Sequence, residues 1–213
     1  RLRVQQVRRQ KIFLTCLFLL IVGCILLRFS KFSGRQEEAH QINAACEAYR
    51  DEVSSEAAQY DMSKYVDLIL AVMMQESSGQ GTDPMQSSEG AYNTRYPQQP
   101  NGITDPSYSI SCGIQELKYA LEKAVCTGPT DLSKIRLALQ AYNFGADSYF
   151  AYLEENGQTV WTAQSAQAFA QMASGGTQRD EDDPLHDPAG PWDYGDQYYP
   201  DHVLRYYHLD NNS

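Results

Sequence analysis

The stretch KYVDLILAVMMQESSG, residues 64–79, decides the fold. Apolar side chains recur along its first part at the spacing of one helical face. The side chains of this face are Tyr65, Leu68, Ile69 and Val72. We therefore expect a helix over Lys64–Gln75 with one buried side, capped by Asp61 or Ser63. The Ser and Gly residues after Glu76 end it.

Glu76 stands at the C-terminal end of this apolar helix. Burial beside apolar side chains disfavours the charged carboxylate and raises its pKa. The partial negative charge of the helix C-terminus acts in the same direction. A carboxyl group that keeps its proton near neutral pH suits a general acid, as glycosidic cleavage requires. Taken alone, the seven residues Met73–Gly79 fit an ordinary solvated glutamate at a helix end better than a catalytic acid.

Helical patterning continues on both sides of this segment. Further helices are expected over Glu37–Tyr60, Ile110–Val125, Leu132–Tyr142, Asp147–Leu153 and Thr162–Met172, and the stretch Gln197–Leu209 closes the domain. Residues 79–108 form a polar loop of a length that is usually functional or disordered. Ser174–Gly195, rich in Gly, Pro and Asp, is interpreted as a surface excursion. Because no run of strands is evident, we predict a mainly α fold.

The N-terminal part has the pattern of a membrane anchor. Residues 1–35 hold 8 of the 17 basic residues and no acidic one, and Ile12–Leu27 is almost wholly apolar. We predict a cytoplasmic basic tail over 1–11, a transmembrane helix over 12–29, a linker over 30–36 and one domain over 37–213. A lipoprotein signal ending at Cys24, or a cleaved secretion signal, are the alternatives. Each of them places the domain outside the cytoplasm, facing the cell wall.

Composition excludes several classes of function for this domain. After residue 35 there are 9 basic residues against 27 acidic ones, a net charge of −18, whereas a nucleic-acid partner needs a basic face. The cysteines and histidines show no metal-ligand spacing, so neither metal nor cofactor is expected. Cys46, Cys112 and Cys126 would form one disulfide plus a thiol, or remain three buried thiols.

Several motifs occur in a fixed order after Glu76. Gln75-Glu76-Ser77, Gly113-Ile114-Gln115 and Ala141-Tyr142-Asn143-Phe144-Gly145 resemble the goose-type lysozyme and lytic transglycosylase superfamily. More closely, QESSG (75–79), DPMQSSEG (83–90), SISCGIQ (109–115), YGD (194–196) and VLRYY (203–207) look like the bacterial lysozyme-like (CwlT-type) domain. That domain occurs in cell-wall hydrolases of Gram-positive conjugative elements. The resemblance covers roughly residues 40–208.

The resemblance implies a goose-lysozyme-like helical domain that cleaves the β-1,4 bond between N-acetylmuramic acid and N-acetylglucosamine. Glu76 matches the catalytic acid, and Asp83 matches a second carboxylate implicated in hydrolysis. The residues that match groove positions holding the sugars are Ser77, Gln86, Ser109, Gln115, Tyr142 and Asn143. By residue type alone, Asp83 could instead be a turn residue before Pro84, Ser109 a helix N-cap, and Asn143 a helix-end residue.

The function expected from this resemblance is that of a membrane-anchored N-acetylmuramidase acting on peptidoglycan. Its partners would be peptidoglycan, the membrane through residues 12–29, and components of a conjugation or type IV secretion apparatus. A lytic transglycosylase, in which Glu76 is acid and then base, is the nearest alternative. A non-catalytic scaffold of a secretion channel and a tethered ligand-binding receptor are others. Larger family members continue into a cysteine-dependent peptidase domain, an activity not expected of this sequence, which stops at Ser213.

Overall fold

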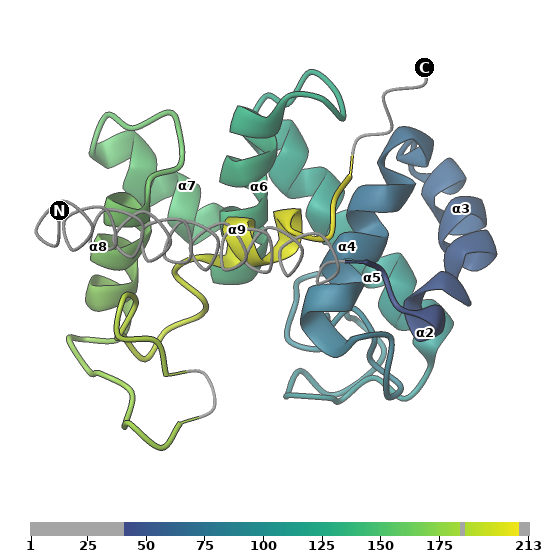
Figure 1. The fold of residues 1–213 in the computed structure, drawn as a ribbon, viewed down its shortest axis with the longest axis horizontal. Coiled ribbons are helices and arrows are strands. Elements are labelled where there is room, and N and C mark those ends of the chain that lie inside the picture. Colours follow the sequence, from purple (N-terminus) through teal and green to yellow (C-terminus); the bar gives the residue numbers. More distant parts are fainter. Residues whose placement is uncertain (1–40, 184–185, 209–213) are drawn as a thin grey trace, which may run out of the picture. The chain divides into compact units, whose positions relative to one another are not determined.

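Helices provide the regular secondary structure of this protein. The computed structural model describes residues 41–183 and 186–208. The elements are α2 (Ala44–Glu47), α3 (Arg50–Gln59), the 3-10 turn η1 (Ser63–Tyr65), α4 (Val66–Ser77), α5 (Pro106–Lys123), α6 (Leu132–Phe144), α7 (Ala146–Glu155), α8 (Ala163–Ala173) and α9 (Tyr199–Leu204). Within these ranges the β-type pairing is one isolated bridge, between Gln178 and Trp192. The prediction of a mainly α fold is confirmed (Figure 1).

The chain divides into two units, Arg1–Gln41 and Ile42–Ser213. The predicted tail, anchor and linker over residues 1–36 lie outside the described residues. Among the helices that are described, none has the length and apolar character needed to span a bilayer.

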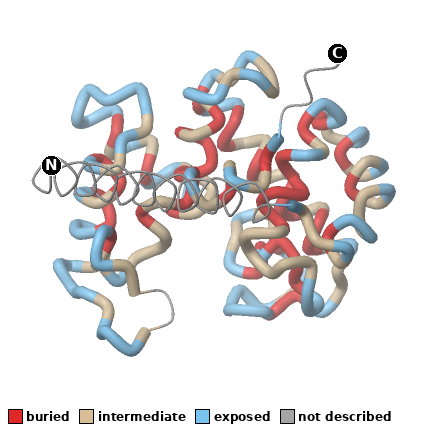
Figure 2. The backbone as a smooth tube through the Cα atoms, in the orientation of Figure 1, coloured by how far each residue is buried: buried red, intermediate tan, exposed pale blue. Residues whose placement is uncertain are grey.

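Helix α4 runs through the hydrophobic core. Every residue from Leu68 to Met73 is buried, and Figure 2 shows this stretch among the buried parts of the tube. Helices α2, α3 and α9 pack against it. The helix ends where Ser78 adopts a left-handed backbone (φ 55°) and its N–H donates to the Met74 carbonyl at 3.2 Å. Glu76 is therefore carried on the last turn of a helix that the core holds in place.

The short helix α9 connects the two sides of the domain. In Figure 1, α2 to α5 gather on one side and α7 and α8 on the other, with α6 and α9 between them. Helix α6 contacts α5, α7 and α9, and α9 also contacts α4. Residues near the C-terminal end of the domain are thereby packed against the helix that bears Glu76.

The predicted continuous helix over Glu37–Tyr60 is wrong in its described part, because it is two helices, α2 and α3, with a break between them. Contacts from the end of α4 fix α2 separately. The Asn43 side chain caps α2 by accepting from the Cys46 N–H at 2.8 Å, and it donates to the Ser78 carbonyl at 3.0 Å. Gly79 lies so close that a Cβ there would be 2.8 Å from the Cys46 nitrogen. Tertiary contacts thus override helical propensity at this point.

The helix predicted over Ile110–Val125 begins one turn earlier, at Pro106. Asp105 supplies the N-cap by accepting from the Ser107 N–H at 3.2 Å, and Pro106 occupies the first turn, where its missing N–H costs nothing. Ser109 therefore lies inside the helix and is not its cap. The other predicted helices are confirmed within one or two residues at each end, as expected for helix boundaries.

Cys46, Cys112 and Cys126 are free thiols, so the alternative with a disulfide is wrong for this structure. The first two are buried and the third is half-buried. Burial raises the pKa of the Cys46 and Cys112 thiols to about 11, which makes both poor nucleophiles near neutral pH.

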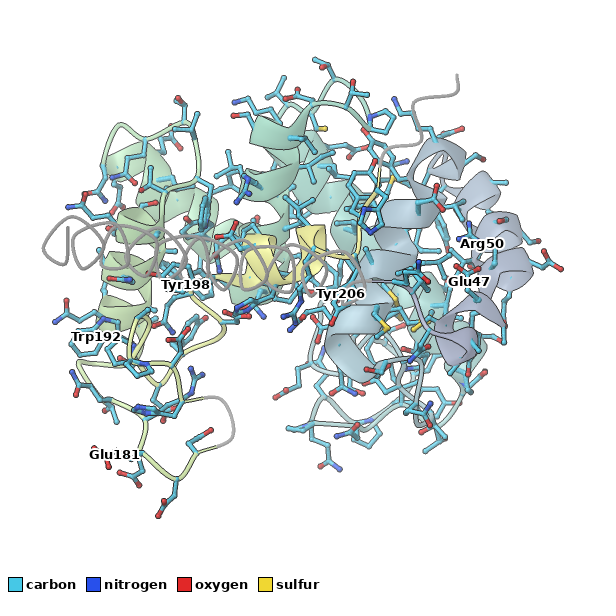
Figure 3. All side chains as sticks on the ribbon, in the orientation of Figure 1. Glu47, Arg50, Glu181, Trp192, Tyr198 and Tyr206 are labelled. Atoms are coloured by element: carbon cyan, nitrogen blue, oxygen red, sulfur yellow. The ribbon has the colours of Figure 1, made fainter. Side chains whose placement is uncertain are left out.

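The segment Ser174–Gly195, predicted as a surface excursion, packs onto the domain through several of its described residues. The Arg179 side chain is only 7% exposed and donates to the Gly195 carbonyl at 2.8 Å. The amide of Gln197 donates to the carbonyl oxygens of Trp192 and Tyr194, each at 3.0 Å. Figure 3 shows Trp192 and Tyr198 of this segment and its C-terminal flank on the opposite side of the domain from the ion pair of Glu47 and Arg50. The segment can therefore form part of a cavity wall.

Candidate active site

Glu76 lies where two cavities meet. The α9 cavity is lined by, among others, Arg179, Asp196, Tyr199, His202 and Arg205. The α5 cavity is lined by, among others, Tyr92, Glu116, Tyr119, Tyr142 and Tyr194. Each has a volume of about 590 Å³, and both include Glu76, Gln86 and Asn143 in their walls. An extended ligand that occupied both cavities would pass the carboxyl group of Glu76.

The environment of Glu76 favours the protonated carboxyl. Desolvation by burial raises its pKa to about 7, and the nearby Asp196 and Asp83 carboxylates act in the same direction. A hydrogen bond from the Tyr199 hydroxyl to Oε1 of Glu76 lowers the pKa and partly offsets these effects. The group is therefore poised to give up a proton near neutral pH.

Two stacked tyrosines stand beside this carboxyl group. Tyr199, the buried first residue of α9, is the hydrogen-bond donor to Glu76. The ring of Tyr142, from α6, lies 6.3 Å from that of Tyr199 at an interplanar angle of 21°, and its hydroxyl donates to the Met85 carbonyl at 2.9 Å. Burial raises the pKa of both phenols well above its ordinary value, so both remain neutral hydrogen-bond donors.

Asp83 is the centre of a buried hydrogen-bond network behind the cavities. Its carboxylate accepts from the N–H of Ser87 at 3.1 Å, from the N–H of Ser88 at 3.2 Å, and from the Ser109 hydroxyl at 2.6 Å. The Ser88 hydroxyl also donates to it. The Ser109 hydroxyl in turn accepts from the Met85 N–H at 3.1 Å. Asp83 lines neither cavity, so the network holds the loop over residues 83–88, and a catalytic role for Asp83 stays a prediction.

Gln86 and Asn143 reach both cavities, each from a braced position. Gln86 has a left-handed backbone (φ 47°), and its side-chain amide donates to the Asp83 carbonyl at 2.9 Å and to Asn101 at 3.0 Å. The Asn143 side-chain oxygen accepts from the Asp196 N–H at 2.7 Å. The structure thus brings Glu76, Gln86, Tyr142 and Asn143 together in the wall of the α5 cavity, and their roles stay predictions.

Ser77 and Gln115 lie elsewhere. The Ser77 hydroxyl donates to the Pro84 carbonyl at 2.8 Å and so ties the end of α4 to the loop, outside both cavities. Gln115 donates to the Ser111 carbonyl at 3.1 Å and lines a third cavity, which does not contain Glu76.

Three residues of the site were absent from the sequence-based candidates: Tyr199, Asp196 and Glu116. Tyr199 and Asp196 are more than 100 residues from Glu76, and no local spacing links them to it. Glu116 follows Gln115 directly, and successive residues of a helix point about 100° apart. The position of Glu116 around the helix axis, on a different side from Gln115, could have indicated it as a candidate. Within the described ranges, no group of three or more His, Cys, Asp or Glu side chains is arranged to hold a metal ion.

Comparison with known proteins identifies relatives of this chain. The family described as lysozyme-like matches residues 44–207. The bifunctional muramidase/DL-endopeptidase CwlT of Bacillus subtilis (strain 168) is 34% identical over 173 residues, which cover 81% of this chain and 43% of CwlT. The uncharacterized membrane protein YocA of the same organism is 40% identical over 52% of this chain and 45% of its own length. The chain thus spans about half the length of these relatives.

A solved structure shares the fold. The crystal structure of a protein similar to lipoprotein, of the NLP/P60 family, from Staphylococcus aureus subsp. aureus Mu50 superposes with a TM-score of 0.66 at 27% sequence identity. The match covers 81% of this chain and 56% of that one.

Proposed function

This chain belongs to the lysozyme-like family, and from that membership and the geometry around Glu76 we propose that it is a peptidoglycan hydrolase, an N-acetylmuramidase. The observation that carries the proposal is a half-buried carboxyl group with a pKa of about 7 at the junction of two cavities. Glycan strands are long polymers, so a cleavable bond at this junction leaves sugars on either side.

In this mechanism Glu76 is the general acid. It protonates the oxygen of the bond between N-acetylmuramic acid and N-acetylglucosamine as that bond breaks. Tyr199 fixes the carboxyl through its hydrogen bond to Oε1, and Tyr142 braces the Tyr199 ring. Gln86 and Asn143, which reach both cavities, supply amide groups for the hydroxyl and N-acetyl groups of the sugars.

A lytic transglycosylase reaction is the second candidate. In that reaction Glu76 acts first as acid and then as base, and the muramic acid's own 6-hydroxyl attacks the anomeric carbon to give a 1,6-anhydro product. The observation in its favour is that Asp83, the second carboxylate expected from the resemblance, lines neither cavity.

The proposed site of action is the cell wall next to the membrane, opened locally for a conjugation-type secretion apparatus. Support comes from the apolar, basic-flanked segment Ile12–Leu27 and from the similarity to a protein named as a membrane protein. A tether would confine cleavage to the wall layers near the membrane. Fractionation of cells that express the full chain should recover it with membranes, and its recovery in the culture supernatant would contradict the tether.

Mass spectrometry of digested peptidoglycan tests the chemistry. Muropeptides with reducing N-acetylmuramic acid ends are expected from the wild type, and their loss is expected from Glu76→Gln. Glu154→Gln, an exposed residue of α7 outside the α5 and α9 cavities, is the matched control. Predominance of 1,6-anhydro ends would select the transglycosylase, and absence of any cleavage by the wild type would reject both reactions.

A further inference from the structure

Glu116 is a second carboxyl group in the cavity that contains Glu76. It belongs to α5 and lines the α5 cavity, and its Oε1 is buried with no hydrogen-bond partner among the described residues. The backbone N–H of Tyr92 is close enough to lower the pKa of this carboxyl group and partly offsets the effect of burial. An unpaired buried oxygen costs free energy, so its retention calls for a role.

The other carboxylates near Glu76 are already engaged. Asp83 accepts four hydrogen bonds and lines neither cavity. Asp196 accepts from the Tyr198 N–H at 2.9 Å and pairs with the His202 ring nitrogen at 2.5 Å. Glu116 differs from both because the residue lines the α5 cavity and its buried Oε1 has no hydrogen-bond partner among the described residues.

The loop after α4 leaves room for this carboxyl group and closes over it. A Cβ placed on Gly90 would lie 1.4 Å from Oε1 and 2.3 Å from Cδ of Glu116. The absence of a side chain at position 90 is therefore what allows Glu116 to occupy its position. The same loop provides the Tyr92 N–H that lowers the pKa of the carboxyl group. Backbone contact on this side restricts where the carboxyl can point.

From this geometry we infer that Glu116 is the second catalytic carboxyl group, the base that activates a water molecule for attack on the anomeric carbon. The inference rests on the proposed function and assigns to Glu116 the task that the resemblance gave to Asp83.

Water is the only co-reactant in the proposed hydrolysis. The Glu116 carboxylate takes a proton from water as the water oxygen forms a bond to the anomeric carbon of N-acetylmuramic acid. The bond from that carbon to the leaving oxygen breaks, and this oxygen takes the proton of Glu76. Glu116 ends protonated and Glu76 ionised, and exchange with solvent restores both. A single displacement of this kind inverts the anomeric configuration.

The charges around Glu116 fit a base that works with a nearby acid. The groups that face it are Glu76 from α4, Asp83 and Tyr92 from the loop, Tyr142 from α6, and Cys112 from its own helix. Desolvation raises the pKa of Glu116 to about 7, and Asp83 and Glu76 add to the effect. The pKa of Glu76 is raised to a similar value, so the state with Glu76 protonated and Glu116 ionised is accessible near neutral pH.

Kinetics of the full chain on purified peptidoglycan test the inference. Glu116→Gln keeps the size of the side chain and its acceptor for Tyr92, and we expect kcat to fall about 100-fold or more with little change in KM. Glu122→Gln, an exposed residue of the same helix, is the matched control and should retain full activity. Added formate should restore part of the kcat of Glu116→Ala, because it can replace the lost base.

Each result decides between the alternatives. A Glu116→Gln enzyme with unchanged kcat, or with only a raised KM, would overturn the inference, as would retention of anomeric configuration in the wild-type product. Those results would leave the proposed function intact as long as Glu76→Gln is inactive. A wild type that releases no reducing ends, or only 1,6-anhydro ends, would remove both. Circular dichroism of Glu116→Gln and Glu116→Ala checks that the variants fold.

Discussion

The Tyr199 hydroxyl donates a hydrogen bond to Oε1 of Glu76 across a sequence separation of 123 residues. Burial of the carboxyl raises its pKa, and this bond lowers it, because the donor stabilises the ionised form. The resulting value of about 7 is a balance between desolvation and the Asp196 and Asp83 carboxylates, which raise the pKa, and the Tyr199 hydrogen bond, which lowers it. The balance can be shifted in either direction by single substitutions.

Tyr199→Phe removes the donor and leaves the ring in place. The pKa of Glu76 should rise, so the alkaline limb of the pH–kcat profile should move to higher pH by about one unit. The profile of Tyr152→Phe, a residue of α7 outside the α5 and α9 cavities, serves as the reference. An unmoved limb would mean that Glu76 is not the group that must be protonated.

Asp196→Asn should move the same limb to lower pH. Asp196 raises the pKa of Glu76 by charge repulsion, and the neutral amide removes that repulsion while it can still accept from the Tyr198 N–H. Asp201→Asn is the matched control, because Asp201 pairs with Arg136 and is not among the groups that shift the pKa of Glu76. A shift in the same direction as that of Tyr199→Phe would contradict this account.

Glu76→Gln should make the protein more stable at alkaline pH. The pKa of Glu76 is about 7 in the folded state against an ordinary 4.5, so the folded state binds more protons between these values. The free energy of unfolding of the wild type therefore falls as pH rises from 4.5 through 7, by about 2–3 kcal/mol. The amide variant escapes this loss. Urea unfolding at pH 8 should show the difference, and at pH 4 the two proteins should be alike.

Asp83→Asn separates a positioning role from a catalytic one. An amide cannot accept from all four donors around Asp83, so unfolding should become easier by about 1–3 kcal/mol. Ser109→Ala, which removes one of those donors, should show a smaller loss of the same kind. If Asp83→Asn kept wild-type stability while kcat collapsed, Asp83 would be acting on the substrate directly.

Gly90→Ala should displace the Glu116 carboxyl without changing its chemistry. The new Cβ would fall 1.4 Å from Oε1, and the flexible end of Glu116 is the part that can give way. We expect kcat to fall at least 10-fold with KM nearly unchanged. Gly128→Ala, where a Cβ meets nothing within 4 Å, is the control. In a Glu116→Gln background the Gly90 substitution should add little, and additive losses would separate the two positions.

The sequence predicts the helices of this domain well where local signals set them. The apolar face of α4 is buried as its spacing indicates, and the helical signal places Glu76 on the last turn. The apolar repeat of α5 starts only at Ile110. Its first turn is instead specified by the cap Asp105 and by Pro106, which lie before that repeat, so the predicted start is one turn late. The break between α2 and α3 depends on Gly79 and Ser78, whose approach to α2 no local pattern encodes.

In the candidate site, too, local sequence signals predict some residues and tertiary packing determines the others. Motif order selects Glu76, Gln86, Tyr142 and Asn143 as candidates, and all four line the α5 cavity. It cannot separate residues that face the cavity from those that support it, since Asp83 and Ser109 belong to the same motifs yet lie behind the loop. The sequence places Tyr199 only within the closing stretch Gln197–Leu209. Its contact with Glu76 depends on the packing of α9 on α4, which no local pattern indicates.

The position of α9 has a consequence for how the protein is made. A ribosome synthesises α4, with Glu76, long before it reaches Tyr199, 123 residues later. A nascent chain therefore carries Glu76 without the phenol of Tyr199 that donates to it and without one wall of the α9 cavity. Under the proposed function, the site around Glu76 is complete only when α9 docks, so a chain that lacks α9 has Glu76 but not the assembled site.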